Sequence, residues 1–179
     1  MAVRHFRAMA LFAAALPFGA VLLSVPAAPA QASGGDLTCS VNLEFYFDPA
    51  LKADGSANVD ITGTLEGCTS MNGRHDQLSA STIKATAQAT ATAARGGKCG
   101  LAISADGSGT LGWVSGATSS FALRITPGSS NGLSIDAAVS DGELKADSIS
   151  LLTLGAQTNQ KCGSRGLTTL SIQGLMTLS

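Results

Sequence analysis

The sequence predicts an all-β domain: an antiparallel β-sandwich of about nine strands, Ig-like or jelly-roll-like in topology, after an N-terminal signal helix. Three observations predict this fold class. Apolar and polar residues alternate along most of the chain, turn dipeptides recur at short intervals, and four cysteines stand in a chain with only 13% charged residues. Because 45% of the residues are hydrophobic, the chain can form a packed core, which argues against disorder.

The alternation is strictest in the first predicted strand, residues 37–47. Its apolar row is Leu37, Cys39, Val41, Leu43, Phe45 and Phe47. A period of two places one row on a buried face and the other row toward water. Similar rows occur within residues 58–66, 118–125, 133–139 and 170–178. We therefore expect antiparallel strands that each have one buried face.

Turn dipeptides separate these rows. Glycine preceded by Asp or Asn tolerates the positive φ that tight hairpin turns require. Such pairs stand at residues 54–55, 106–107, 131–132 and 141–142. We expect the chain to reverse direction at each of them.

Residues 85–93 alternate alanine with threonine or glutamine. A helix would spread the threonines round every face, whereas a strand places all the alanines on one side. We therefore expect a strand that packs closely through its alanine face. The alternative is a threonine array matching an ice or polysaccharide surface, which needs several such strands in register, and the sequence contains one.

Residues 1–32 have the pattern of a signal peptide, and residues 33–179 would form a single exported β domain. Two arginines give a positive start, residues 8–23 are apolar, and an Ala-Gln-Ala run offers the small side chains that signal peptidase requires. We place cleavage after Ala32, with cleavage after Ala30 as the alternative. A retained membrane anchor is the other interpretation of this segment.

The predicted mature domain is mildly acidic. Two of the 11 Lys and Arg lie in the signal, so nine remain against 12 Asp and Glu, a net charge of −3. This balance provides no basic surface for nucleic acid, and we expect no membrane span after the signal. We expect a secreted, extracellular protein whose partner is the cell wall, an extracellular protein or a glycan.

The cysteines agree with export. They are Cys39, Cys68, Cys99 and Cys162. An even number in an exported chain favours two disulfides. No C-x-x-C pair occurs and a single histidine follows the signal, so we expect neither a metal site nor a cofactor.

Hairpin geometry suggests how the cysteines pair. If the first two predicted strands form a hairpin, opposite residues have numbers that sum to about 106, and Cys39 and Cys68 nearly satisfy this rule. They come within disulfide reach if a bulge forms at Gly63 or Gly67. The other two cysteines then pair and tie two edge loops at one end of the domain. Two other pairings remain open.

Further motifs accompany the cysteines: Phe45-Tyr46-Phe47-Asp48-Pro49, Gly63-Thr64-Leu65-Glu66-Gly67, Gly109-Thr110-Leu111-Gly112-Trp113 and Gly163-Ser164-Arg165-Gly166-Leu167-Thr168. In these motifs the chain resembles a group of uncharacterised small four-cysteine secreted β proteins of actinomycetes. The resemblance covers nearly all of the mature chain and implies a β-sandwich, with no chemistry to carry over. The composition is also similar to that of the carriers of enediyne antibiotics, whose disulfides close shorter loops.

Candidate catalytic residues do not form a familiar constellation. Residues 128–132 match the G-x-S-x-G pattern of hydrolases, but their flanking Pro and Asn-Gly favour a hairpin. His75 precedes Asp76 on a polar stretch, where consecutive side chains diverge. Four acidic residues crowd one predicted hairpin, but alternation and turn placement direct them to solvent: Asp136, Asp141, Glu143 and Asp147. We therefore expect no catalytic residues.

Binding is the function that the sequence favours. Trp113 shares the parity of Leu111, which predicts burial, whereas Tyr46 alternates outward as a single exposed ring. Loop 69–77, with Arg74 at its tip, is a candidate contact for a protease or receptor. We expect a non-catalytic binding module or envelope and matrix component. The alternatives are a secreted hydrolase of the glycosidase or esterase class, a small-ligand carrier and a protease inhibitor.

The signal-peptide interpretation predicts the N-terminus of the exported protein. When the full chain is expressed in a secreting host, Edman sequencing and intact mass should show a chain that starts at Ser33. A product that starts at Gln31 would support the alternative cleavage site. A product that keeps residues 1–32 would show that the segment is a retained anchor.

Overall fold

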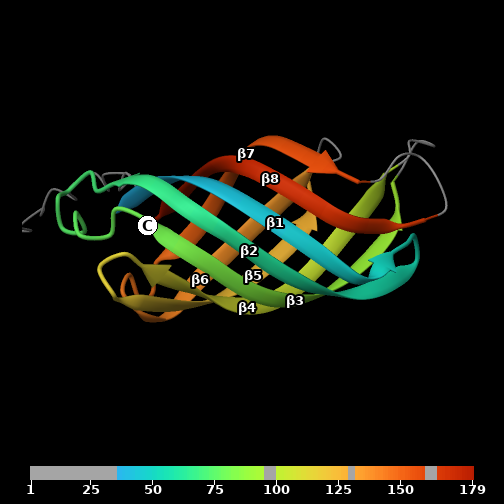
Figure 1. Ribbon diagram of the computed structural model, residues 1–179, viewed down its shortest axis with the longest axis horizontal. Helices are drawn as coiled ribbons and strands as arrows, with labels where there is room; N and C mark the ends of the chain where they lie inside the picture. The colour runs from blue at the N-terminus through green and yellow to red at the C-terminus, as the bar shows by residue number, and fades with distance from the viewer. Residues whose placement is uncertain (1–35, 95–99, 129–131, 160–164) are drawn as a thin grey trace, which may run out of the picture. The chain divides into compact units, whose positions relative to one another are not determined.

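The computed structural model describes residues 36–94, 100–128, 132–159 and 165–179. The described residues form eight long β-strands (Figure 1). Their bounds are β1 (Leu37–Leu51), β2 (Gly55–Thr69), β3 (Ser81–Ala93), β4 (Leu101–Trp113), β5 (Thr118–Pro127), β6 (Leu133–Gly142), β7 (Ser148–Thr158) and β8 (Leu167–Leu178). The described part of the chain holds no helix long and apolar enough to cross a membrane. The predicted signal peptide and its cleavage site at Ala32 lie outside it.

The strands close into an antiparallel β-barrel, so the predicted β-sandwich is wrong. Every strand pairs with its neighbour in the chain, and β8 completes the circle by pairing with β1 from Leu37↔Leu178 to Phe45↔Leu170. Figure 1 shows β8 lying beside β1. An Ig-like or jelly-roll-like topology needs strands that cross between two sheets, whereas here each hairpin simply continues the previous one. Closure leaves one interior in place of two facing sheets.

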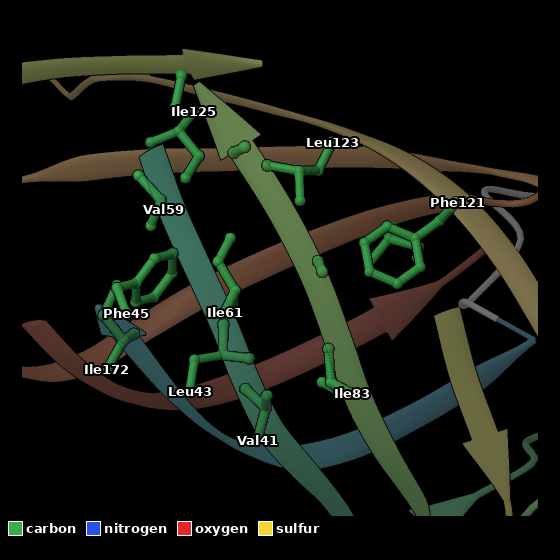
Figure 2. Close-up of a cluster of buried hydrophobic side chains, with 14 of the residues drawn as sticks. Val41, Leu43, Phe45, Val59, Ile61, Ile83, Phe121, Leu123, Ile125 and Ile172 are labelled. Carbon is green, nitrogen blue, oxygen red and sulfur yellow. The ribbon is translucent and has the colours of Figure 1, made fainter. Parts of the chain in front are cut away.

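The interior is filled by the apolar rows that the sequence predicted. Along β1 the burial alternates without a break from Leu37 to Phe47, and β3 buries its alanines in the same way. Figure 2 shows a cluster of the interior side chains and labels Val41, Leu43, Phe45, Val59, Ile61, Ile83, Phe121, Leu123, Ile125 and Ile172. An eight-stranded barrel is just wide enough for its own side chains to fill. The outward rows are exposed and mostly polar.

The described residues form eight strands, fewer than the nine or so predicted from the sequence, because the turn predicted at residues 106–107 does not form. β4 runs straight through both residues and pairs with β3 and β5 on either side. A Cβ on Gly107 would overlap the backbone of Thr86 and the side chain of Ala87. This glycine therefore permits a close approach between strands. Positive φ at Asp54 and Gly142 confirms the turns expected there.

One end of the barrel, which we call the closed end, is sealed by apolar side chains. Leu78 from the β2–β3 loop and Leu144 from the β6–β7 turn are both buried there. Trp113 is 4% exposed, as predicted, and its Nε1 donates a hydrogen bond to Ser119 Oγ at 2.9 Å. Ser119 Oγ in turn donates to the carbonyl oxygen of Glu143. The buried indole nitrogen is thus satisfied, and the tryptophan fastens three segments together.

A disulfide joins Cys39 and Cys68 at the closed end, the pairing that hairpin geometry suggested. The β1–β2 register follows the expected sum along most of the hairpin and shifts between Thr38 and Ser40. Opposite this shift, Gly67 has a φ of +60°, which is the bulge that brings the two cysteines together. The predicted second pair, Cys99 with Cys162, lies outside the described residues.

Replacing both cysteines of this disulfide by alanine should lower the free energy of unfolding by about 3 to 4 kcal/mol. The loop-entropy estimate for a separation of 29 residues gives this value, because the reduced chain regains freedom when it unfolds. Guanidinium titration of Cys39→Ala with Cys68→Ala, followed by circular dichroism, measures the loss. A change below about 1 kcal/mol would mean that the bulge and the strand pairing hold this hairpin without the bond.

Candidate functional site

The barrel wall is incomplete between β6 and β7. These strands share only three residue pairs, Asp136↔Ser150, Ala137↔Ile149 and Ala138↔Ser148, whereas β5 and β6 pair from Ser119 to Pro127. Beyond Ser150, β7 remains paired with β8 alone as far as Thr158. The first residues of β6 likewise pair with β5 alone. We call the resulting gap the β6–β7 opening; it faces the end of the barrel opposite the closed end.

A cavity of about 370 Å³ lies at this opening, and we call it the mouth cavity. Its lining comes from four strands and their adjoining loops: Gly100, Leu101, Ile103, Gly132, Leu133, Thr153, Ala156, Thr158, Leu167, Leu170 and Ile172. Small-molecule sites in proteins have volumes of about 300–1,000 Å³ and are lined mainly by apolar side chains with a few polar groups. The mouth cavity meets both conditions.

The side chains on the β7 wall of this cavity explain why it is open. Ala156 lies opposite Ile172, and Thr158 lies opposite Leu170, so both β7 residues are on the inward face of their strand. Their partners on β8 are buried, yet Ala156 and Thr158 themselves are exposed. Along this part of β7 the pairing partner on the β6 side is missing, so its inward residues are left uncovered. The opening thus connects solvent with the apolar inner surface.

Deeper in the barrel the interior is tightly filled. A second void of only about 40 Å³ is lined entirely by apolar side chains, among them Leu43, Phe45, Ile83, Phe121 and Met176. This volume accommodates little more than one to three water molecules. A bound molecule therefore has room in the mouth cavity, while the packed core forms its floor.

Exposed leucines stand next to the opening. Leu152 is 61% exposed and Leu154 is 68% exposed, and Leu175 on β8 is paired with Leu152. A bulge between Thr153 and Gly155 interrupts the β7–β8 register at this point. Contiguous exposed apolar residues are uncommon on soluble domains and mark places where something apolar binds. These three leucines extend the apolar character of the mouth cavity onto the outer surface.

The predicted catalytic candidates do not converge. Asp136 lies on the outer face of β6, Asp141 forms an ion pair with Lys145 at 3.2 Å, and Glu143 is exposed. The hydrogen bond from Lys145 holds the pKa of Asp141 below its usual range. Serines 129 and 130 of the G-x-S-x-G match lie outside the described residues. The expected hairpin is present at its flanks, where Gly128 N donates to Gly132 O at 2.8 Å.

His75 and Asp147 lie at the closed end, far along the chain from each other and away from the mouth cavity. Burial raises the pKa of Asp147, the negative charge of Asp36 raises it further, and His75 opposes that rise. Asp147 Oδ2 and His75 Nδ1 are buried without a hydrogen-bond partner in the described structure. Asp36 is held by Asn72 at 2.6 Å and by Arg74 at 3.6 Å. Through Asn72 and Arg74, this cluster fastens the β2–β3 loop, residues 70–80, to Asp36, which precedes β1.

Tyr46 points outward and is 48% exposed, as predicted, on the part of β1 that faces solvent. The residues that line the mouth cavity were not singled out by the sequence analysis. One signal could have found them: residues 151–154 read Leu-Leu-Thr-Leu, which places large apolar side chains at adjacent positions and so departs from period-two alternation. Among the described residues, no three His, Cys, Asp or Glu side chains are grouped so that they could hold a metal ion.

The fold and the site together define an eight-stranded up-and-down barrel with an apolar interior and a lateral mouth. No family model, curated protein or solved structure matches this chain.

The raised pKa of Asp147 predicts a stability that depends on pH. Because its pKa is higher in the folded state than in the unfolded state, ionisation of this carboxyl destabilises the folded protein. Asp147→Asn should therefore raise the melting temperature at pH 7. The corresponding gain in the free energy of unfolding should be less than about 1 kcal/mol, because the carboxyl group is partly solvated. The gain should shrink as the pH falls through the ordinary pKa of aspartate, about 3.9, and be nearly lost at about pH 3, where the carboxyl is mostly protonated in both states.

Thermal unfolding of both proteins from pH 3 to pH 8 tests this dependence. Asp136→Asn is the matched control, because this exposed residue loses the same charge on the outer wall. A stabilisation of Asp147→Asn that is equal at pH 3 and pH 7 would show that the effect does not come from ionisation.

Proposed function

We propose that this protein is a secreted, non-catalytic binding module that holds a small apolar ligand in the mouth cavity. The observation that carries the proposal is the volume of about 370 Å³ next to the β6–β7 opening, lined mainly by Leu, Ile, Ala and Gly. The disulfide between Cys39 and Cys68 is compatible with export to an oxidising compartment. A small-ligand carrier is the form of binding module that this cavity favours.

Two features describe the ligand. Apolar surface supplies most of the contact, so removal of hydrocarbon from water drives binding at about 25 cal/mol per Å² of apolar area. The polar side chains in the lining are Thr153 and Thr158, both on β7 at the solvent side. Either hydroxyl group can bond a polar group of the ligand. An amphiphile that places its apolar part against Leu170 and Ile172 and its polar group near β7 fits both features.

Filling the cavity should abolish binding. Ala156 lies on the inward face of β7 in the lining, so Ala156→Phe places a ring in the space that the ligand would occupy. Titration of the purified, exported protein with Nile red, an uncharged apolar dye, should give saturable binding at one site. We expect Ala156→Phe to raise the Kd at least tenfold, which corresponds to about 1.4 kcal/mol.

Two control variants locate the dye. Ala122→Phe adds the same ring on the outer face of β5 and should bind as the parent protein does. Leu152→Ser removes one exposed leucine outside the cavity and should leave the stoichiometry unchanged. Absence of saturable binding by the parent, or equal binding by Ala156→Phe and Ala122→Phe, would contradict the proposal.

A further inference from the structure

A second hollow lies on the outer face of the wall, over β2, β3 and β4. Its volume is about 520 Å³, and it shares no lining residue with the mouth cavity. Six outward side chains surround it: Asn58, Asp60, Thr86, Gln88, Asp106 and Ser108. Its floor includes the backbone of Val59, Ala87 and Gly107. These three residues belong to the inward rows of their strands. We call this hollow the outer groove.

Small inward residues explain why a barrel wall is hollowed here. Beneath the groove, Ala87 faces Gly107 and Ala85 faces Gly109 across the β3–β4 pair. A Cβ on either glycine would overlap the backbone or the alanine of β3. With so little side-chain volume inside, the two strands can lie closer to the barrel axis than strands that carry Leu or Ile. The outer face above them is correspondingly recessed.

The polar side chains of the groove form two rows across the strands. In the first row Asn58, Gln88 and Asp106 lie side by side in register. Gln88 Nε2 donates to Asn58 Oδ1, and Arg124 Nε donates to Asp106 Oδ1 at 2.9 Å. Directly opposed residues on antiparallel strands have Cβ atoms about 4.5–5.5 Å apart. The row is therefore a continuous, oriented series of amide and carboxylate groups.

The second row consists of Asp60, Thr86 and Ser108, again in register. None of their side chains forms a hydrogen bond within the described residues, so one carboxylate and two hydroxyls remain available to a ligand. Tyr46 continues this row on β1, where it lies opposite Asp60 with its ring 48% exposed. An amphipathic ring thus stands beside unsatisfied acceptors and donors.

We propose that the outer groove binds a neutral glycan, with Tyr46 stacking on a sugar ring while Asp60 and Gln88 bond its hydroxyls. Sugars present both hydroxyl groups and an apolar face, and this groove offers planar polar side chains beside an aromatic ring. Because Arg124 neutralises Asp106, Asp60 leaves the groove slightly negative, which disfavours phosphate and sulfate groups. This site is independent of the mouth cavity and of the ligand proposed there.

The threonine row of β3 lies between polar residues of the two neighbouring strands. In the sequence it stood alone, and a polysaccharide surface would have required several such strands. In the structure Thr86 and Thr90 are flanked in register by polar residues of β2 and β4, from Ser56 on one side to Ser104 on the other. Three strands together therefore supply the polar array that one strand cannot.

Affinity electrophoresis of the exported protein through gels that contain xylan, mannan, soluble glycol chitin or hydroxyethyl cellulose tests the proposal. We expect at least one of these neutral polysaccharides to retard the parent protein. Asp60→Ala with Gln88→Ala, and separately Ser108→Trp, should raise its Kd at least tenfold. Glu143→Ala is the matched control, because it removes an exposed carboxylate in the β6–β7 turn away from the groove, and it should be retarded as strongly as the parent.

Circular dichroism and melting temperature show whether each variant keeps its fold, and the two groove variants perturb different strands. No retardation of the parent by any of the four polysaccharides would overturn the proposal. Retardation by heparin alone, or equal retardation of both folded groove variants and the parent, would also overturn it. Nile red binding should be unchanged in every groove variant, so failure at one site is distinguishable from failure at the other.

Discussion

The pairing of β1 with β8 is the constraint on which the rest of the structure depends. It joins the two strands that are farthest apart in the chain, from Leu37↔Leu178 onward, and so converts a meander into a closed wall. Once the wall is closed, every inward row must share one interior of limited width. This explains why the rows mix Phe and Ile with Ala and Gly: large side chains fill the centre, and small ones allow the wall to come close.

The two proposed sites are consequences of places where this closed wall departs from regularity. At the β6–β7 opening the two strands are not paired along most of their length, which leaves inward residues such as Ala156 exposed to solvent. At the outer groove the pairing is intact, and the departure is the small inward volume at Gly107 and Gly109. The first irregularity exposes apolar surface and the second recesses polar surface. The mouth cavity therefore favours an apolar ligand, and the outer groove favours a polar one.

Sequence reasoning predicted the local features of this protein well. The inward rows, the strand at residues 85–93, the burial of Trp113 and the Cys39–Cys68 bond all follow from period-two alternation and hairpin arithmetic, which involve near neighbours. Closure was not predictable, because a sandwich and a barrel have the same alternation and differ only in which distant edges pair. The turn predicted at Asp106-Gly107 was wrong for a related reason. Glycine occurs where two strands approach each other closely as well as in turns, and the sequence does not distinguish the two cases. The mouth cavity was missed because lost pairing between β6 and β7 leaves only a short irregularity in the sequence.

The register between Leu37 and Leu178 also determines how this barrel can be attached to anything else. Both residues lie at the closed end, opposite the mouth cavity, and the outer groove lies on the side wall between the two ends. A tether, a fused domain or a solid support joined next to either residue would thus leave the cavity directed away from the point of attachment. Such a molecule could be anchored at its base and still exchange a ligand with the surrounding fluid.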